Sequence, residues 1–288
     1  MANGPRFLIA ESETREAREK RRSSTGRSSG ESYSQTLRSI VPGAICELIQ
    51  PVETNGREAP SADLSDYDAV FLTGSPMHVY KDTPQVRRQL AFMRSVFDSA
   101  TPSFGSCAGL QVAVAAAGGS VRENRRHEIG FARRITPTDA GRSHPLLAGR
   151  PPVYDAAAIH SDEVEHLPED GTLIATSAMT RVQAAEIRYG DGVFWGVQYH
   201  PELPLSEIAD ALRRQSGDVM EQGLARSEAD VEAYASLVDA LDREPCRLDI
   251  AWRLGVNEQV TEAARRQTEL RNFIEHLVKP TMSRRGRA

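Results

Sequence analysis

The chain has 288 residues, of which 40% are hydrophobic and 26% are charged. These proportions are those of an ordinary globular protein, and they exclude a chain that is disordered throughout. The sequence holds 35 basic and 40 acidic residues, a net charge of −5, which argues against a dedicated nucleic-acid-binding protein. No apolar run approaches the roughly 20 residues of a membrane-spanning helix, so we expect no membrane partner.

The cysteines and the N-terminal segment both indicate a reducing compartment. Cys46, Cys107 and Cys246 are an odd number and include no CxxC pair, so neither a disulfide framework nor a zinc knuckle is expected. The apolar run at residues 7–10 is too short for the core of a secretory signal. We therefore expect a cytoplasmic protein.

Residues 1–119 alternate short apolar runs with longer stretches of helical period. This pattern is typical of an α/β protein with a mainly parallel sheet. We predict strands at residues 6–10, 44–49, 69–72 and 102–104, and helices at 32–40, from Pro84 onward, and from Cys107 to Gly118. Residues 11–30 are rich in arginine and serine, and we interpret them as a polar loop with at most a short helix.

Beyond residue 120 the hydrophobic period changes to two, which predicts an antiparallel extension of the sheet. Strands are expected at residues 129–136, 153–158, 172–177, 184–189 and 193–199, followed by helices at 205–212, 219–241 and 257–278. An apolar stripe is expected to dock the last helices, formed by Trp252, Leu254, Leu270, Phe273, Ile274 and Leu277. We predict a three-layer, doubly wound α/β domain at residues 1–212 and a helical extension at 213–288.

A candidate nucleophile lies where a buried strand meets a helix. Gly105-Ser106-Cys107-Ala108-Gly109 has the pattern of a nucleophile elbow, a sharp strand-to-helix turn, with cysteine as the nucleophile. Glycines flank such a residue because side chains there would collide with neighbouring backbone. The partial positive charge of the helix N-terminus favours the thiolate. A buried structural cysteine beside a glycine-rich turn is the alternative interpretation.

A candidate base and its partner follow the last predicted strand. In an extended chain, His200 and Glu202 point to the same side, and Pro201 stiffens the spacer between them. Glu202 can then orient the imidazole of His200 while its other nitrogen faces Cys107. A solvated loop histidine followed by a helix-capping glutamate is the alternative.

Three segments carry a family resemblance. Residues 102–111 and 195–202 resemble the two signatures of class I (triad) glutamine amidotransferases, and residues 71–76 are similar to the oxyanion loop of that family. The amidotransferase domain of GMP synthetase and its free-standing relatives are the most similar subgroup, over roughly residues 66–203. The resemblance implies a flavodoxin-like α/β fold and a catalytic triad. Cys107 would attack the glutamine amide, His200 would protonate the departing ammonia and activate water, and Glu202 would orient His200.

The resemblance also implies the surroundings of the nucleophile. Backbone N–H groups of Ser75 and Ala108 would form the oxyanion hole. Gly74 and Gln111 match positions that line the glutamine pocket, and His160 matches a segment near the rim of the site. The resemblance implies no cofactor. Histidine and acidic residues at 160–166 do not indicate a metal, because adjacent residues of a strand point to opposite faces.

Two features depart from the family pattern. Gly74-Ser75-Pro76 stands where Gly-Gly-Pro is frequent, and Ala108 stands where a larger residue is usual, which would widen the pocket mouth. The predicted C-terminal helices contain no GxxxxGK[ST] phosphate loop. We therefore expect a separate synthetase or acceptor subunit to use the ammonia, and the C-terminal helices are candidates for its interface or for a homo-oligomer.

Three functions follow from these patterns. The first is a glutamine-hydrolysing amidotransferase or glutaminase. The second is a hydrolase of γ-glutamyl peptides or γ-glutamyl amines that uses the same triad, suggested by Ala108 and by the lack of a synthetase motif. The third is a non-enzymatic scaffold that binds through its arginine-rich segment and helical tail. Residues 11–30 themselves are either a solvated loop or a docking surface or lid over an anionic acceptor at the carboxyl edge of the sheet.

Overall fold

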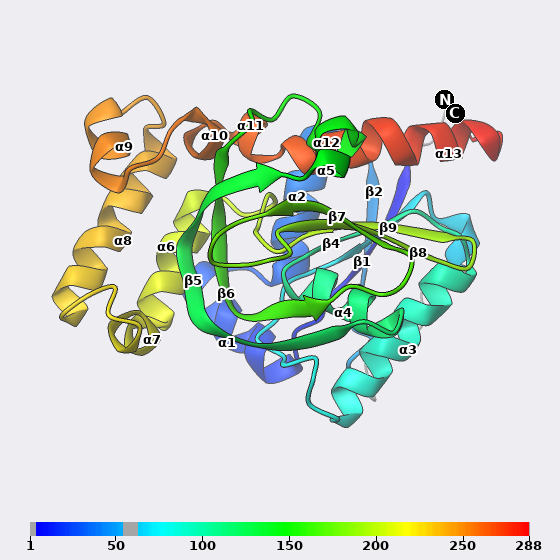
Figure 1. The fold of residues 1–288 in the computed structure, drawn as a ribbon, viewed down its shortest axis with the longest axis horizontal. Coiled ribbons are helices and arrows are strands. Elements are labelled where there is room, and N and C mark those ends of the chain that lie inside the picture. The colour runs from blue at the N-terminus through cyan, green and yellow to red at the C-terminus, as the bar shows by residue number, and fades with distance from the viewer. Residues whose placement is uncertain (1–3, 54–62, 288) are drawn as a thin grey trace.

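The centre of the protein is a nine-stranded sheet in the order β2-β1-β3-β4-β9-β8-β7-β5-β6 (Figure 1). The computed structural model describes residues 4–53 and 63–287. The first five strands in this order run parallel, and the other four extend the sheet with antiparallel pairs. The predicted mixed α/β sheet is therefore confirmed. The strands are β1 (Arg6–Ala10), β2 (Ile45–Ile49), β3 (Ala69–Leu72), β4 (Ser103–Ser106), β5 (Ser120–Pro137), β6 (Tyr154–His166), β7 (Gly171–Thr176), β8 (Ala184–Tyr189) and β9 (Gly192–Val197).

Helices cover both faces of the parallel part of the sheet. The helices among the described residues are α1 (Arg15–Thr25), α2 (Ser29–Ile40), α3 (Pro84–Asp98), α4 (Ala108–Ala116), α5 (Asp139–Ser143), α6 (Leu205–Arg214), α7 (Ser216–Glu221), α8 (Glu228–Arg243), α9 (Leu248–Leu254), α10 (Glu258–Thr261), α11 (Ala263–Arg266), α12 (Thr268–Phe273), the π-helical segment η3 (Ile274–Val278) and α13 (Lys279–Arg284). Two short turns of 3₁₀ helix lie at Leu64–Asp66 and Pro145–Leu147.

Alternation along the parallel strands sorts their apolar side chains into two cores, and a third core joins β5 and β6 to α6, α8 and α9. In β1, Phe7 and Ile9 belong to a core shared with α2 and α12, whereas Leu8 and Ala10 belong to a core shared with α3 and α4. Phe273 of α12 packs against the ring of Phe104 in β4. The C-terminal helices therefore complete one face of the sheet. The domain division at residue 212 stays a prediction.

The segment 11–30 differs from the predicted loop, because α1 forms over Arg15–Thr25 and α2 begins at Ser29. None of the residues of α1 is buried, so the apolar periodicity by which a helix is recognised is absent. The helix is fixed at its ends instead. The side chain of Thr14 caps its first turn, and Gly26, with φ of 75°, ends it.

Three further expectations need correction. The strands predicted at 129–136 and 153–158 are longer than expected, since β5 begins at Ser120 and β6 reaches His166, and the two pair along their length. The added residues were missed because β-bulges interrupt the period-two pattern there. The predicted helix over residues 257–278 is divided into α10, α11, α12 and η3. Trp252 does not belong to the docking stripe, since its exposed fraction is 81%, whereas Leu270, Phe273 and Ile274 of that stripe are buried.

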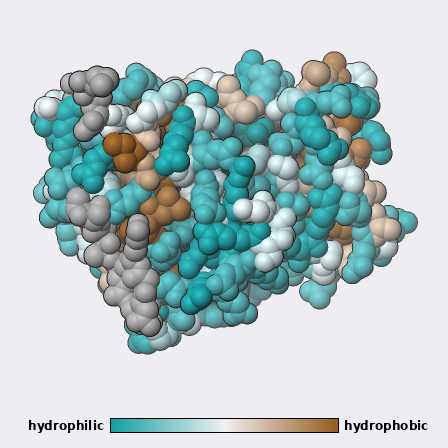
Figure 2. All heavy atoms as spheres, turned by 180° about the vertical axis from the view of Figure 1, so that it is seen from behind, coloured by the Kyte–Doolittle hydropathy of each residue, from teal (hydrophilic) through white to brown (hydrophobic). Residues whose placement is uncertain are grey.

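The surface of the molecule is mostly hydrophilic. Figure 2 shows hydrophobic side chains only in scattered groups on the face opposite to that of Figure 1. Among the described residues, none of the helices combines the length and the apolar character that a membrane span requires.

Candidate active site

The candidate site lies at the carboxyl edge of the parallel strands. The segments that follow β1, β3, β4 and β9 meet there around a cavity of about 430 Å³. Open α/β sheets bind ligands at this edge. Gly74, Cys107 and His200 line the cavity, and α1 and α6 close one side of it.

Cys107 occupies the predicted elbow between β4 and α4. Its φ of 54° and ψ of −111° form a strained turn, held by a 2.8 Å hydrogen bond from its N–H to the carbonyl of Val197. A Cβ on Gly105 would lie 2.7 Å from the carbonyl carbon of Gly109, and one on Gly109 would lie 2.6 Å from the Leu72 oxygen. The glycines are therefore required by close backbone packing. Cys107 precedes the first residue of α4, so it lies at the N-terminus of that helix.

His200 and Glu202 form the predicted pair. His200 Nδ1 lies 2.7 Å from Glu202 Oε1, and both side chains are buried. Burial lowers the pKa of His200, but the Glu202 carboxylate and a hydrogen bond with Cys107 outweigh it and raise the pKa to about 10. The imidazolium is therefore the stable form of this ring at neutral pH.

Gly74 makes room for the imidazole. A Cβ at this position would lie 2.7 Å from Cε1 of His200. The predicted role of Gly74 as a pocket residue therefore has a steric basis: a side chain here would push His200 away from its present place. The imidazole has no room to move toward Glu202, because its Nδ1 is already within hydrogen-bond distance of that carboxylate.

The predicted oxyanion and pocket residues surround Cys107. Ser75 lines the cavity, and Ala108 is the first residue of α4, so its N–H has no partner in the preceding helical turn. The amide of Gln111 also lines the cavity, and it donates to the carbonyl of Asp162 at 3.1 Å. Whether these groups bind substrate stays a prediction.

His160 contacts protein on both sides of its ring. Its Nε2 lies 2.8 Å from Glu128 Oε2 and its Nδ1 lies 2.9 Å from the carbonyl oxygen of Asp162. Thr180 and Gln183 also donate to Glu128 Oε2. His160 lines the cavity with its ring nitrogens already engaged, so it is placed to hold the rim in shape.

The C-terminal helices reach the segment that carries His200. Tyr199 donates to Glu269 of α12 at 2.8 Å, and Arg150 binds both carboxylate oxygens of Glu269 at 2.7 Å. Arg266 of α11 donates to the carbonyl of Leu203 at 3.3 Å. These contacts hold the chain on both sides of His200.

Residues from α1 and α6 complete the site, and the sequence did not identify them. Glu13, Lys20 and Arg21 line the cavity together with Glu207 and Arg214. Arg21 Nη2 binds Glu207 Oε2 at 2.5 Å. The arginine-rich composition of residues 11–30 is the signal in the sequence for Lys20 and Arg21, and it favours a solvated loop over a docking surface or lid.

Comparison with known proteins identifies the family. The family model "Glutamine amidotransferase class-I" matches residues 30–216. The chain belongs to the class-I glutamine amidotransferase family. Among class-I glutamine amidotransferase structures, one from Thermotoga maritima superposes with a TM-score of 0.63, covering 95% of this chain and 98% of that one at 16% identity, which shows the shared fold.

Two curated relatives of this amidotransferase chain have different names. The γ-glutamyl-L-1-hydroxyisopropylamide hydrolase of a Pseudomonas species is 36% identical over 228 residues, which cover 77% of this chain and 76% of that protein. A glutamine-hydrolysing GMP synthase subunit of Ignicoccus hospitalis is 31% identical over 163 residues, which cover 54% of this chain and 81% of that protein. Longer relatives named GMP synthase are matched over 26% of their length.

Proposed function

We propose that Cys107, His200 and Glu202 form a catalytic triad that hydrolyses the side-chain amide of glutamine. The observation that supports this most strongly is the buried His200 ring, which hydrogen-bonds to Glu202 and lines the same cavity as Cys107 at the elbow. A nucleophile, a base and an orienting carboxylate in this order are the parts that acyl transfer requires.

The reaction proceeds through a thioester. The Cys107 thiolate attacks the carboxamide carbon, and the N–H groups of Ser75 and Ala108 stabilise the negative oxygen that forms. The protonated His200 transfers its proton to the nitrogen, so that the C–N bond breaks and ammonia leaves. The neutral ring then removes a proton from water, which attacks the thioester and releases glutamate. Glu202 keeps the ring in one orientation throughout.

The test uses the Cys107→Ala variant and a glutamine-like diazo ketone. We expect the variant to lose ammonia release by at least about a thousandfold, because the residual rate then depends on binding and the oxyanion hole alone. Mass spectrometry of the wild-type chain should find the label on Cys107, with glutamine blocking it. Cys246→Ala is the matched control, since Cys246 is exposed and should be dispensable. Labelling elsewhere, or an active Cys107→Ala variant, would contradict the triad and favour the scaffold interpretation.

A second candidate is the hydrolysis of substituted γ-glutamyl amides by the same triad. It is favoured by the Pseudomonas relative, which is named for such a substrate and is covered over 76% of its length. Both candidates share the γ-glutamyl group and differ in the amine that leaves. Comparing kcat/KM for glutamine with that for γ-glutamyl alkylamides separates them, since a strong preference for glutamine would exclude the second.

If glutamine is the substrate, we propose that the ammonia passes to a separate acceptor enzyme. The relative named as a subunit of GMP synthase supports this, because it is covered over 81% of its length. The C-terminal helices remain the proposed surface for that partner or for a second copy. Trp252 and Leu248 of α9 are 81% and 67% exposed, so their replacement by serine, followed by size measurement and pull-down, tests this surface.

A further inference from the structure

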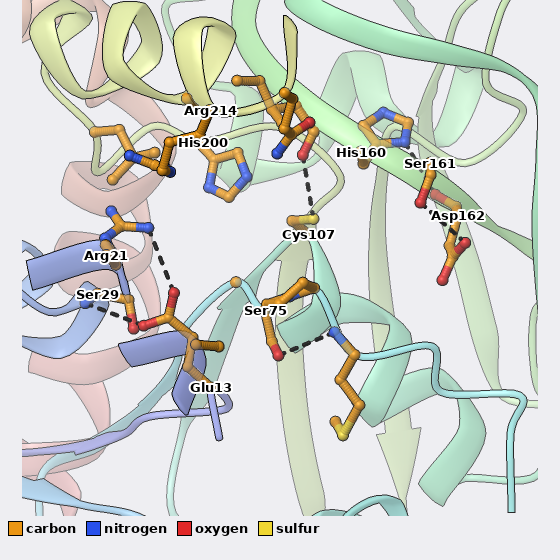
Figure 3. A pocket seen from close by; sticks show the side chains of 18 of the residues that line it. Glu13, Arg21, Ser29, Ser75, Cys107, His160, Ser161, Asp162, His200 and Arg214 are labelled. Carbon is orange, nitrogen blue, oxygen red and sulfur yellow. Dashed lines mark hydrogen bonds and ion pairs between the residues drawn. The ribbon is translucent and has the colours of Figure 1, made fainter. Parts of the chain in front are cut away.

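The position of His200 defines where the leaving amine lies. In the triad mechanism His200 protonates the departing nitrogen, so that nitrogen must face the ring. Figure 3 shows His200, Arg21 and Arg214 on one side of Cys107, and His160, Ser161 and Asp162 on the other. The amine of a γ-glutamyl amide therefore extends toward α1 and α6, while its glutamyl part extends toward Asp162.

The amine side of the cavity is built from protein side chains. Residues of α1, α6 and α7 line it. Ammonia is too small to fill the space between these side chains. A cavity of about 430 Å³ is within the usual size of small-molecule sites. The space therefore fits an amine with a substituent.

Hydrogen-bond donors line this side of the cavity, and two of its carboxylates, Glu207 and Glu13, already have partners within the protein. Glu207 accepts from Ser32 at 2.6 Å and from Arg21 at 2.5 Å, each at a different oxygen. Glu13 accepts from the N–H of Ser29 at 3.4 Å and lies 3.7 Å from Arg21 Nη1. In contrast, Arg21 Nε is buried and has no partner among the described residues. The guanidinium of Arg21, which lines the cavity, is therefore not fully hydrogen-bonded within the described part of the protein.

Arg214 adds a second guanidinium to the same region. Its Nη1 donates to Ser24 of α1 at 2.8 Å, which ties α6 to α1. Burial and the positive charge of Arg21 lower the pKa of Arg214, and the carboxylates of Asp210, Glu13 and Glu207 offset part of the repulsion between the two cations. Lys20 lines the cavity from the same helix as Arg21. An oxygen acceptor placed among these groups would relieve the repulsion.

We infer that α1 and α6 form a subsite for the amine half of a substituted γ-glutamyl amide, and that this amine carries a hydroxyl or carboxylate oxygen that Arg21 and Arg214 bind. This inference rests on the second candidate function. The amide C–N bond breaks, the amine leaves with the proton from His200, and water hydrolyses the γ-glutamyl thioester to glutamate. No further reactant is needed.

Four γ-glutamyl amides of similar size test the subsite. They are the amides of ethanolamine, glycine, n-propylamine and ethylenediamine, and glutamine is measured beside them. We expect kcat/KM for the ethanolamine or glycine amide to exceed that for the propylamine amide by about tenfold or more, because a site built to bind an oxygen discriminates against an analogue that lacks it. The ethanolamine and glycine amides distinguish a hydroxyl from a carboxylate as the preferred group. A preference for the ethylenediamine amide would overturn the inference, since the carboxylates Glu13 and Asp218 would then select a cation.

The Arg214→Gln variant tests the residue assignment. We expect the ratio of kcat/KM between the preferred oxygen-bearing amide and the propylamine amide to fall toward one. The matched control is Arg213→Gln, because Arg213 of α6 binds Glu232 and Asp239 of α8 instead. This control should keep the wild-type ratio. Melting temperatures of both variants separate a binding effect from a loss of folded protein.

The outcomes separate this inference from the proposed function. If glutamine and the propylamine amide are cleaved as well as the oxygen-bearing amides, the subsite is wrong while the triad stands. If wild-type protein cleaves none of the γ-glutamyl amides, glutamine included, the proposed function itself is wrong. An unchanged ratio in Arg214→Gln, with wild-type melting, would contradict the assignment of this residue.

Discussion

The nucleophile and the base of the site are held in place in different ways. Cys107 is positioned mainly by the strand, turn and helix that contain it, through the close packing of Gly105 against Gly109, and the hydrogen bond from its N–H to Val197 adds one distant contact. His200 depends on segments far away in the sequence. Its N–H donates to the carbonyl of Ala157 at 2.8 Å, and Thr36 donates to the carbonyl of Glu202 at 2.8 Å. The difference teaches that a nucleophile elbow is a local structure, whereas the base is a product of tertiary packing.

The C-terminal helices hold the segments next to the base. Glu269 is fully buried, and Tyr199 approaches it from the segment after β9, while Arg150 approaches it from the turn after Pro145–Leu147. Burial opposes the charge of Arg150, but the carboxylate of Glu269 more than offsets this and raises its pKa. Arg150 therefore remains charged inside the protein. Removing one partner leaves the other buried and uncompensated.

The largest effect is expected for Glu269→Gln. We predict a loss of about 3 kcal/mol in the free energy of unfolding, because Arg150 loses its buried counter-charge. We also expect kcat to fall, since Tyr199 immediately precedes His200. Urea unfolding and steady-state kinetics measure both quantities. The matched control is Glu275→Gln, whose exposed pair with Lys279 should contribute less than about 0.5 kcal/mol. Equal stability of the two variants would contradict the role given to the C-terminal helices.

A smaller loss of stability is expected for Gly105→Ala. This variant tests whether local backbone packing positions Cys107. A Cβ here overlaps backbone atoms of Gly109, so we predict destabilisation by about 1–3 kcal/mol. Turnover should fall at least about a hundredfold, because the elbow must open to accept the methyl group. Gly217→Ala is the control, since nothing lies within 4 Å of its added Cβ. A fully active Gly105→Ala variant would show that the elbow tolerates a looser geometry.

Tyr199→Phe should have a still smaller effect. It removes one hydrogen bond to Glu269 and keeps the Arg150 pair, so we predict a loss of about 1 kcal/mol. If the hydroxyl also helps to position His200, kcat should fall a few-fold while KM changes little. Tyr234→Phe, on α8 and away from the triad, provides the comparison. Unchanged kcat with reduced stability would restrict Tyr199 to a structural role.

The smallest change in activity near neutral pH is expected from the titration of His200. Its pKa of about 10 lies above the ordinary 6.5, so the proton that the leaving nitrogen needs is present below about pH 10 and is lost above it. We expect kcat/KM to remain level up to about pH 9 and to fall as the pH rises through 10. Glu202→Gln removes the main charge that raises this pKa, so its fall should begin at lower pH. A fall of the wild-type rate near pH 7 would contradict the imidazolium assignment.

Prediction from the sequence succeeds where a pattern reflects local structure. Strand β3 lies at the predicted residues 69–72, and the glycines around Cys107 indicate the elbow, because steric rules act over a few residues. The helix α1 escapes prediction because its side chains are exposed and carry no apolar period. In α9, Ile250 and Leu254 are buried, whereas Trp252 between them is exposed to solvent. Periodicity cannot decide which face of a short helix meets the core.

The sequence by itself determined the α/β class, the family and the three residues proposed as the triad, because these follow from short motifs whose geometry the backbone imposes locally. Only the tertiary structure decided that α1 and α6 close the amine side of the cavity, and that a buried pair between Arg150 and Glu269 supports the segment carrying His200. The physical reason is that ion pairs and cavity walls join residues more than a hundred positions apart, such as Arg21 and Glu207. Which of many charged side chains become neighbours depends on how the whole chain packs.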